Sequence, residues 1–534
     1  MYNVYMKFYR KYTFEVWVFA LSLLANILVF LPHLIGYLNQ TPELRFTAIS
    51  ADFFMDEFSY FAWVKQAIDG NFLFGILYTT EYHQSLVFHP IFLLIGFTQK
   101  LLKIPTEFLW YLGCLTSNFF LASSIYIFIK KVLSDSFTRI LAFAIIMFGG
   151  GLGWITQFPT ADKLYTEATI FQTLRWPIIF SLAAGLLVLS FYFIIKSYQE
   201  NSKYLAVMAG LSGFVLILIH PYDVVTFYII PLGFLVNLYF LKRIQLTKKL
   251  VLISILWFVP PLIPSLYYFF LSLSNQVYRQ NSQIEMLSGP VMEYVLGYGL
   301  IGVLAILGFI FFKGIFSNDK VFLISWSLFG AIILYFPISF QRRFVMGLIV
   351  PLGILSAQFV VYALEKVEVI LEYKYKSLIN GTIITLLVIF LFGTNADVLK
   401  KDIENVNAMS FPHYIDTPTL NAIGWMDKNI SKDSVILSSY DMGMIIPRYS
   451  GNNVYAGHWA QTLDLNTKLF LINQFFSGQL SGEEQRILFK DSGVDYVFVR
   501  GLDFDFPGNI SILNQNTMLE SIYDSRGVII FKVK

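Results

Sequence analysis

Charged residues are scarce in this 534-residue chain, at 14% of the sequence. Soluble globular proteins carry roughly 25%. The hydrophobic fraction is 56%. Together these values exclude a soluble class for most of the chain. The net charge of +3 is also too small to indicate a nucleic-acid partner.

Cysteine and the common site motifs are also missing or nearly so. The single Cys114 excludes an intramolecular disulfide, and its apolar surroundings indicate a small buried residue. His83 and His89 match no zinc-ligand spacing. The glycine-rich run 149–153 lacks the Lys-Ser/Thr pair of a nucleotide P-loop, which favours close helix packing or a backbone bend.

Long apolar runs and aromatic residues are abundant instead. Runs near 20 residues are long enough to cross about 30 Å of hydrocarbon. Aromatics reach 18%, and many lie near the predicted membrane edges, where amphipathic rings are favoured. The predicted spans are 14–38, 108–129, 140–158, 177–195, 204–219, 222–241, 250–271, 291–312, 321–337, 344–362 and 378–394. We therefore expect an α-helical polytopic membrane protein with about 11–12 transmembrane helices.

Basic residues predict the orientation of these helices. If the shorter apolar segment 86–102 is re-entrant or surface-lying, the N-terminus and all the basic clusters share the cytoplasmic side. Those clusters are Lys130-Lys131 with Arg139, Lys196 with Lys203, Lys242-Arg243 with Lys248-Lys249, Lys313 with Lys320, and Lys366 with Lys374 and Lys376. A full span at 86–102 would turn the later clusters outward. We expect a multi-pass plasma-membrane protein with an uncleaved N-terminal anchor.

This topology collects the candidate polar groups on the outer face. They lie in the first outer loop 39–85, the loop 159–176, the segment 220–223, the pair 342–343 and the region after 395. In that last region Asp, Asn, Gly and Ser become more frequent, and segments with strand and helix patterns alternate. We therefore expect a transmembrane domain over 1–395 and an extracytoplasmic α/β domain over 396–534.

The first outer loop contains the acidic pair Asp56-Glu57, followed by Tyr60. A predicted amphipathic helix then runs from Tyr60 to Gly70, with Phe61, Val64, Ala67 and Ile68 facing lipid, and His89-Pro90 opens the next apolar segment. This arrangement resembles the first extracytoplasmic loop of the GT-C glycosyltransferase superfamily, which includes the protein O-mannosyltransferases and the lipid A aminoarabinose transferases.

Two later stretches extend the resemblance along the chain. The segments 341–357 and 439–464, which begin Gln-Arg-Arg-Phe and Ser-Tyr-Asp-Met-Gly, are similar to uncharacterised bacterial members of that superfamily.

The resemblance implies a hexosyl or pentosyl transferase. Such an enzyme moves a sugar from a polyprenyl phosphate or pyrophosphate to an acceptor hydroxyl on the outer membrane face, with inversion. The acceptor hydroxyl needs a general base, a role that the resemblance places on Asp56. Glu57 is the nearby alternative, and Asp52 joins by helical spacing. Arg342 and Arg343 have guanidinium forks suited to the leaving phosphate.

Further candidate substrate-binding residues are Tyr60, His89, Glu167, His220 and Asp223. Each has a plainer interpretation. His220 also fits a polar cap at a helix break before Pro221. Glu167 also fits a surface ion pair with Arg175. Arg342 and Arg343 also fit an anchor to lipid head groups. His458 and Trp459 fit either a structural role or a contact to acceptor or sugar.

The expected partners are a polyprenyl-phosphate-linked sugar donor, membrane lipid, and a glycan, lipid or protein acceptor. The resemblance leaves room for a divalent cation, Mg²⁺ or Mn²⁺, held by carboxylates and donor phosphate, since some relatives use one and others do not. The alternative function is a multi-span transporter or flippase of lipid-linked sugars. A third interpretation is a non-catalytic scaffold that binds the lipid carrier.

Overall fold

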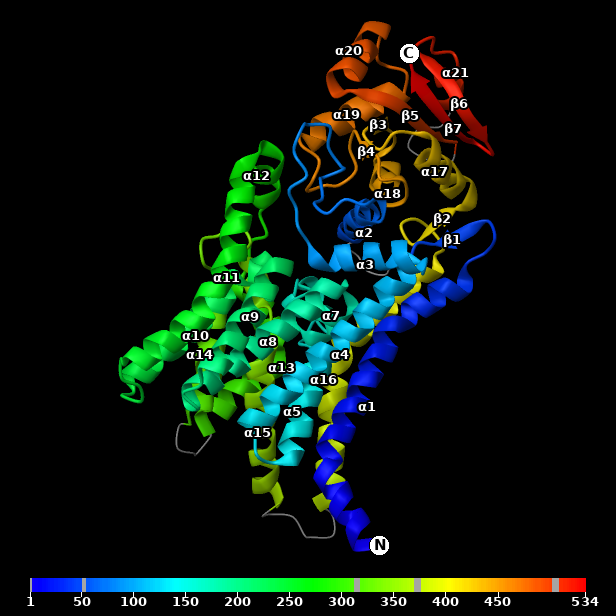
Figure 1. Ribbon diagram of the computed structural model, residues 1–534. Coiled ribbons are helices and arrows are strands. Elements are labelled where there is room, and N and C mark those ends of the chain that lie inside the picture. Colours follow the sequence, from blue (N-terminus) through cyan, green and yellow to red (C-terminus); the bar gives the residue numbers. More distant parts are fainter. Residues whose placement is uncertain (1, 50–53, 312–316, 369–375, 502–508) are drawn as a thin grey trace. The chain divides into compact units, whose positions relative to one another are not determined.

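The computed structural model describes residues 2–49, 54–311, 317–368, 376–501 and 509–534 (Figure 1). Contacts divide the chain into two compact units. The bundle unit comprises 1–32, 111–268 and 285–403, and the sheet unit comprises 33–110, 269–284 and 404–534. Each unit is therefore built from segments far apart in the sequence.

Helices dominate the bundle unit. The elements that lie in it wholly or in part are α1 (Tyr2–Asn39), α4 (Thr106–Val132), α5 (Ser136–Phe148), α6 (Ala161–Leu164), α7 (Ile170–Arg175), α8 (Ile178–Gln199), α9 (Lys203–Ile219), η1 (Pro221–Asp223), α10 (Val224–Phe240), α11 (Lys248–Ser274), α13 (Val291–Phe311), α14 (Asn318–Ile333), η2 (Gln341–Val345), α15 (Ile349–Glu368) and α16 (Lys376–Asn407). The pairs α8–α9, α13–α15, α10–α14 and α5–α15 pack together.

Within the described residues, eight helical segments are long and apolar enough to cross a membrane. They are Phe14–Asn39, Thr106–Val132, Ile178–Gln199, Pro221–Phe240, Lys248–Ser274, Val291–Phe311, Gln341–Lys366 and Gly381–Asn407. The other three predicted spans correspond to the shorter helices α5, α9 and α14, of 13, 17 and 16 residues. The predicted helical membrane fold is confirmed.

The predicted span 140–158 is too long, since α5 ends at Phe148. The glycines that follow make a close backbone contact, as their sequence suggested. A Cβ on Gly151 would lie 2.3 Å from the carbonyl oxygen of Gly297, and the Asp162 carboxylate accepts the Gly151 N–H at 2.7 Å. Only glycine fits such an approach.

The ambiguous segment 86–102 forms α3 (Pro90–Leu102), a helix of 13 residues. At 1.5 Å per residue it is about 20 Å long, shorter than the roughly 30 Å of a hydrocarbon core. Its length favours the re-entrant or surface-lying alternative.

The sheet unit contains a five-stranded sheet in the order β4-β3-β5-β7-β6. β3 (Val435–Leu437) is parallel to β4 (Asn453–Val454) and to β5 (Val494–Arg500), whereas β7 (Val528–Val533) is antiparallel to β5 and to β6 (Leu519–Ser525). The helices of the unit are α2 (Phe54–Asp69), α3, α12 (Gln276–Ser282), α17 (Thr417–Asn429), α18 (Tyr440–Ser450), α19 (Leu465–Phe476), α20 (Gly482–Ser492) and α21 (Asn509–Asn514). The predicted C-terminal α/β region is confirmed.

Side chains alternate between the two faces of this sheet. Val497, Val499 and Phe531 share a buried cluster with Phe475 of α19 and Phe489 of α20. The intervening residues Phe498 and Ile530 are also buried, and α17 packs on β6 and β7.

The first loop is part of the sheet unit. β1 (Leu44–Phe46) pairs antiparallel with β2 (Tyr414–Asp416), and α2 packs on α3 and α18. The predicted lipid-facing residues Phe61, Val64 and Ala67 are buried in these contacts. The prediction that this apolar stripe faces lipid is wrong, because the stripe packs against other helices of the protein.

The pairing expected for Arg175 is also wrong. Arg175 is 8% exposed and forms a bidentate ion pair with Asp402 of α16, with distances of 2.6 and 2.8 Å. Both groups lie in the bundle unit. A planar guanidinium fork matched to a carboxylate is the strong form of this interaction.

Asp402→Asn should lower the free energy of unfolding by about 3 kcal/mol, because it leaves the Arg175 guanidinium buried without an opposite charge. The measurement is the thermal unfolding midpoint of the purified protein in detergent. Asp397→Asn is the matched control, since Asp397 lies on the same helix in an exposed pair with Lys163 at 2.7 Å. That change should cost less than about 1 kcal/mol. Equal losses in the two variants would contradict the prediction.

Candidate functional site

Asp56 lies in the first turn of α2, where the helix dipole favours a carboxylate. Its Oδ1 atom is 3.2 Å from Nε2 of His458. The Asp56 side chain is 24% exposed, and that of His458 only 3%. The sheet unit thus holds one carboxylate oxygen against a buried imidazole and leaves the carboxyl group partly open.

The protonation of the imidazole follows from its other contact. The backbone N–H of Ala460 donates to Nδ1 of His458 at 3.1 Å. An acceptor nitrogen carries no hydrogen, so in the neutral ring the hydrogen is on Nε2. His458 therefore donates to Asp56 and fixes the direction of its carboxylate.

The turn that carries His458 is tied to the first loop. Thr462 Oγ1 accepts the backbone N–H groups of Gly457 and His458, each at 3.2 Å, and donates to the Tyr78 carbonyl at 2.7 Å. Gln461 Nε2 donates to Ser59 Oγ, one turn beyond Asp56, at 3.3 Å. The segment 457–462, called here the His458 turn, is therefore fixed by hydrogen bonds within itself and by hydrogen bonds to Tyr78 and Ser59.

Two glycines allow this turn to approach α18. A Cβ on Gly457 would lie 2.3 Å from the Gly443 carbonyl oxygen, and one on Gly443 would lie 1.9 Å from that of Ala456. Both glycines fall in the segment 439–464 that carried the family resemblance. Sequence reasoning found the segment but not its contact with Asp56.

The other first-loop candidates point elsewhere. Glu57 follows Asp56 on the helix and is buried at 4% exposure, and successive helical residues project about 100° apart. His89 caps the start of α3, and its ring stacks on Phe92 at 4.0 Å. Tyr60 stacks on the same Phe92 ring at 5.3 Å. Asp52 lies outside the described residues.

A second group of candidates meets in the bundle unit. Arg343 and the buried Glu167 form an ion pair. Burial raises the pKa of Glu167, but Arg343 and Arg342 outweigh that effect and hold it below its ordinary value. Glu167 therefore stays ionised at neutral pH.

His220 and Asp223 complete this group. His220 Nδ1 is 2.9 Å from the Asp223 carboxylate, and both side chains are buried. The His220 ring contacts Phe180 and Tyr222, and the Arg343 guanidinium lies over the same two rings at 5.6 and 5.2 Å.

Arg342 occupies a different side of the group. Its guanidinium lies 5.0 Å from the centroid of the Tyr165 ring, and its buried Nε has no hydrogen-bond partner among the described residues. The Tyr165 hydroxyl donates to Glu293. Burial and that carboxylate raise the pKa of Tyr165 to about 12, so the phenol is neutral. Sequence reasoning missed Glu293 because its partner lies 128 positions away.

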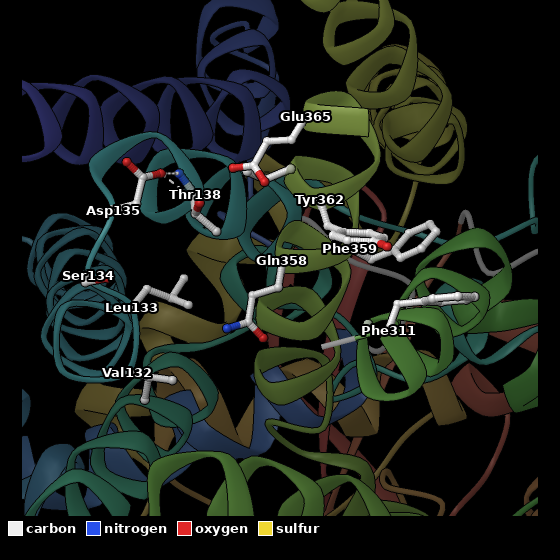
Figure 2. Close-up of a pocket in the computed structure, with 12 residues that line it drawn as sticks. Val132, Leu133, Ser134, Asp135, Thr138, Phe311, Gln358, Phe359, Tyr362 and Glu365 are labelled. Atoms are coloured by element: carbon white, nitrogen blue, oxygen red, sulfur yellow. Dashed lines mark hydrogen bonds between the residues drawn. The ribbon is translucent and has the colours of Figure 1, made fainter. Parts of the chain in front are cut away.

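A cavity of about 450 Å³ lies elsewhere in the bundle unit (Figure 2). Its lining includes Leu133, Asp135, Gln358, Tyr362 and Glu365. Leu133 and Asp135 come from the connection between α4 and α5, and the other three come from the middle and end of α15, whereas Arg342 and Arg343 precede α15. About 14 Å of α15 lies between its first residue, Ile349, and Gln358, and neither arginine lines the cavity, so this cavity is not part of their group.

The described residues contain no group of three or more His, Cys, Asp and Glu side chains that could hold a metal ion. Asp56 faces His458, and Glu167 faces Arg343. These side chains do not fit a preformed divalent-cation site, and no chemical step is assigned to one.

Comparison with solved structures identifies the oligosaccharyltransferase of Archaeoglobus fulgidus. The structure tethered with an acceptor peptide containing the NVT sequon has a TM-score of 0.54 at 11% identity, covering 92% of this chain and 70% of that chain. Archaeal oligosaccharyltransferase AglB from the same organism, in complex with an inhibitory peptide and a dolichol-phosphate, has a TM-score of 0.51 at 12% identity, covering 98% and 75%. ArnT from Cupriavidus metallidurans in the apo state has a TM-score of 0.48 at 10% identity, covering 95% and 97%.

AglB is a GT-C membrane glycosyltransferase. This chain has the GT-C fold. The fold expected from the acidic pair and the two later segments is therefore confirmed. A scan against protein-family models and a search of curated proteins gave no match. At 11–12% identity the likeness carries the GT-C fold alone, so the roles of individual residues stay predictions.

The Glu167 contacts predict a pH effect. Its pKa is lower in the folded than in the unfolded state, so its stabilising contribution is complete above the unfolded value of about 4.3 and is lost as pH falls through the folded value. Glu167→Gln should flatten the fall in stability below about pH 4. The measurement is the unfolding midpoint against pH. Glu483→Gln, at a side chain 73% exposed, should keep the wild-type slope, and a wild-type slope in Glu167→Gln would refute the assignment.

Proposed function

We propose that this protein is a glycosyltransferase that moves a sugar from a polyprenyl-phosphate-linked donor to an acceptor hydroxyl. The observation that carries the proposal is the Asp56 carboxylate, partly open and oriented by a buried histidine donor, in a chain with the GT-C fold. The neighbour AglB supports the donor class, since its structure is a complex with a dolichol-phosphate.

Asp56 is proposed as the general base. The acceptor oxygen attacks the anomeric carbon while its proton passes to the Asp56 carboxylate, and the bond from that carbon to the phosphate oxygen breaks. A single displacement inverts the anomeric centre. His458 serves as a positioning residue, because its Nε2–H holds one carboxylate oxygen and leaves the other to receive the proton.

Arg342 and Arg343 are proposed to bind the donor phosphate, whose charge grows as the bond breaks. Fixed cations stabilise such charge best in a water-poor site. Arg343 is already paired with Glu167, whereas the buried Nε of Arg342 lacks a hydrogen-bond partner among the described residues. Arg342 is therefore the better placed of the two to take up a phosphate oxygen.

The other bundle-unit candidates have supporting roles in this proposal. Glu167 orients Arg343, and Asp223 orients His220. The His220–Asp223 pair is a polar group close to Arg343, because the His220 ring and the Arg343 guanidinium both contact the Phe180 and Tyr222 rings.

We propose a plasma-membrane location with the N-terminus in the cytoplasm, supported by the basic clusters at the predicted cytoplasmic ends of the helices. Asp56 and Arg342 then belong to outer-face segments.

Asp56→Asn should reduce sugar transfer from a polyprenyl-phosphate-linked donor by at least about 10²-fold, because the amide cannot accept the acceptor proton. Radiolabelled sugar transfer by the purified protein in lipid vesicles measures this. Asp69→Asn on the same helix, where the carboxylate pairs with Lys65 at 2.6 Å, is the matched control. Full turnover in Asp56→Asn would reject the base, and movement of an intact lipid-linked sugar between leaflets would support a flippase.

Arg342→Gln should lower transfer by about 10²-fold through lost stabilisation of the phosphate charge. Arg342→Lys should recover only part of it, since an ammonium lacks the guanidinium fork. Steady-state kinetics with the donor varied is the measurement, and Arg243→Gln, at an exposed arginine of the same unit, is the control. Unchanged kinetics in both Arg342 variants would remove this residue from the site.

A further inference from the structure

The His458 turn carries an exposed aromatic residue that the proposed chemistry does not use. Trp459 is 47% exposed, although its neighbour His458 is 2% exposed and Gln461 is 7% exposed. About half of this large apolar ring is therefore open to solvent, although the segment around it is buried.

The indole lies beside the proposed base. Its ring is nearly parallel to the His458 imidazole, with an interplanar angle of 20° and a centroid distance of 6.2 Å. His458 in turn contacts Asp56 at 3.2 Å. The His458 imidazole therefore lies between the indole, where a ligand ring could stack, and the Asp56 carboxylate.

Hydrogen bonds also fix the backbone that carries this ring before any ligand binds. Thr462 accepts two backbone N–H groups of the turn, and the Thr462 N–H donates back to the His458 carbonyl at 2.9 Å. A rigid aromatic platform binds a ligand at little cost in conformational entropy.

We propose that the acceptor is a saccharide whose ring stacks on Trp459, an inference that rests on the proposed function. One face of a sugar ring presents C–H groups, which suit the apolar face of an indole. Its edge presents hydroxyl groups, one of which would point to Asp56. An aromatic surface bordered by a few placed polar groups is the usual form of a small-ligand site.

The surroundings favour a saccharide over a membrane contact. Among the described residues of 404–534, the exposed large hydrophobic residues are Trp459, Phe470 and Ile487. Phe470 lies on α19 and Ile487 on α20, so Trp459 is the exposed large hydrophobic residue of its own turn. Membrane-anchoring surfaces gather several such residues, whereas the side chains of His458, Gln461 and Thr462 on the same turn are polar and buried.

The test is saturation-transfer difference NMR on the full-length protein with maltotetraose, cellotetraose and chitotetraose as probes. At least one should bind the wild type, Trp459→Ala should weaken that binding by about tenfold, and Trp459→Phe should restore most of it. Phe470→Ala, which removes an exposed aromatic ring of the same unit, is the matched control and should bind normally. Circular dichroism checks that each variant is folded.

Transfer assays separate this inference from the proposed function. Trp459→Ala should raise the KM for the bound saccharide about tenfold with little change in kcat, whereas Asp56→Asn should lower kcat. Saccharide binding that is lost in Trp459→Ala, in a protein that transfers no sugar, would keep the stacking site but reject the proposed function and with it the acceptor role. Transfer to a peptide or lipid hydroxyl with no saccharide bound, or a loss confined to vesicle binding in Trp459→Ala, would overturn the inference.

Discussion

Burial of charge in apolar surroundings is the constraint on which this structure depends. An ionised group taken out of water is strongly destabilising unless an opposite charge or good hydrogen bonds accompany it. The bundle unit meets this requirement with defined pairs, in which Glu167 faces Arg343, Arg175 faces Asp402 and His220 faces Asp223. Each partner comes from a different place in the chain or across a helix break, so the pairs also fix how helix ends meet.

The same requirement explains why the candidate groups are well ordered. A buried guanidinium over two aromatic rings, as for Arg343 on Phe180 and Tyr222, has few alternative positions. The Asp56 carboxylate is more exposed than these buried groups, since it contacts one histidine and is otherwise partly open to solvent. A group that must exchange a proton with a ligand needs this access, whereas a group that only holds charge does not.

Local signals in the sequence predicted most of the elements. The alternating strand and helix patterns expected after residue 395 are present as β3, α19 and β5, and Asp416 caps α17 by accepting the Thr419 N–H at 2.8 Å. Such features depend on neighbours within a few residues. The burial of α2 was not predictable in this way, because an apolar stripe has the same period whether it faces lipid or α18.

The contacts of the candidate site were also beyond local reasoning. Asp56 and His458 lie 402 positions apart, and Glu167 and Arg343 lie 176 apart. Sequence patterns indicated that each residue type was suited to a site, but a partner at that separation is set by the three-dimensional fold. The glycines at 443 and 457 were the one local sign, since they mark a close approach of two backbones.

The pairing of β1 with β2 bears on how the protein is made. Residues 44–46 emerge early from the ribosome, and their strand partners 414–416 emerge only after the last apolar helix. The segment that contains Asp56 gains α3 soon after it is made, but its C-terminal partners β2 and α18 arrive only near the end of synthesis. A chain halted partway would carry the acidic pair but not the histidine that contacts Asp56.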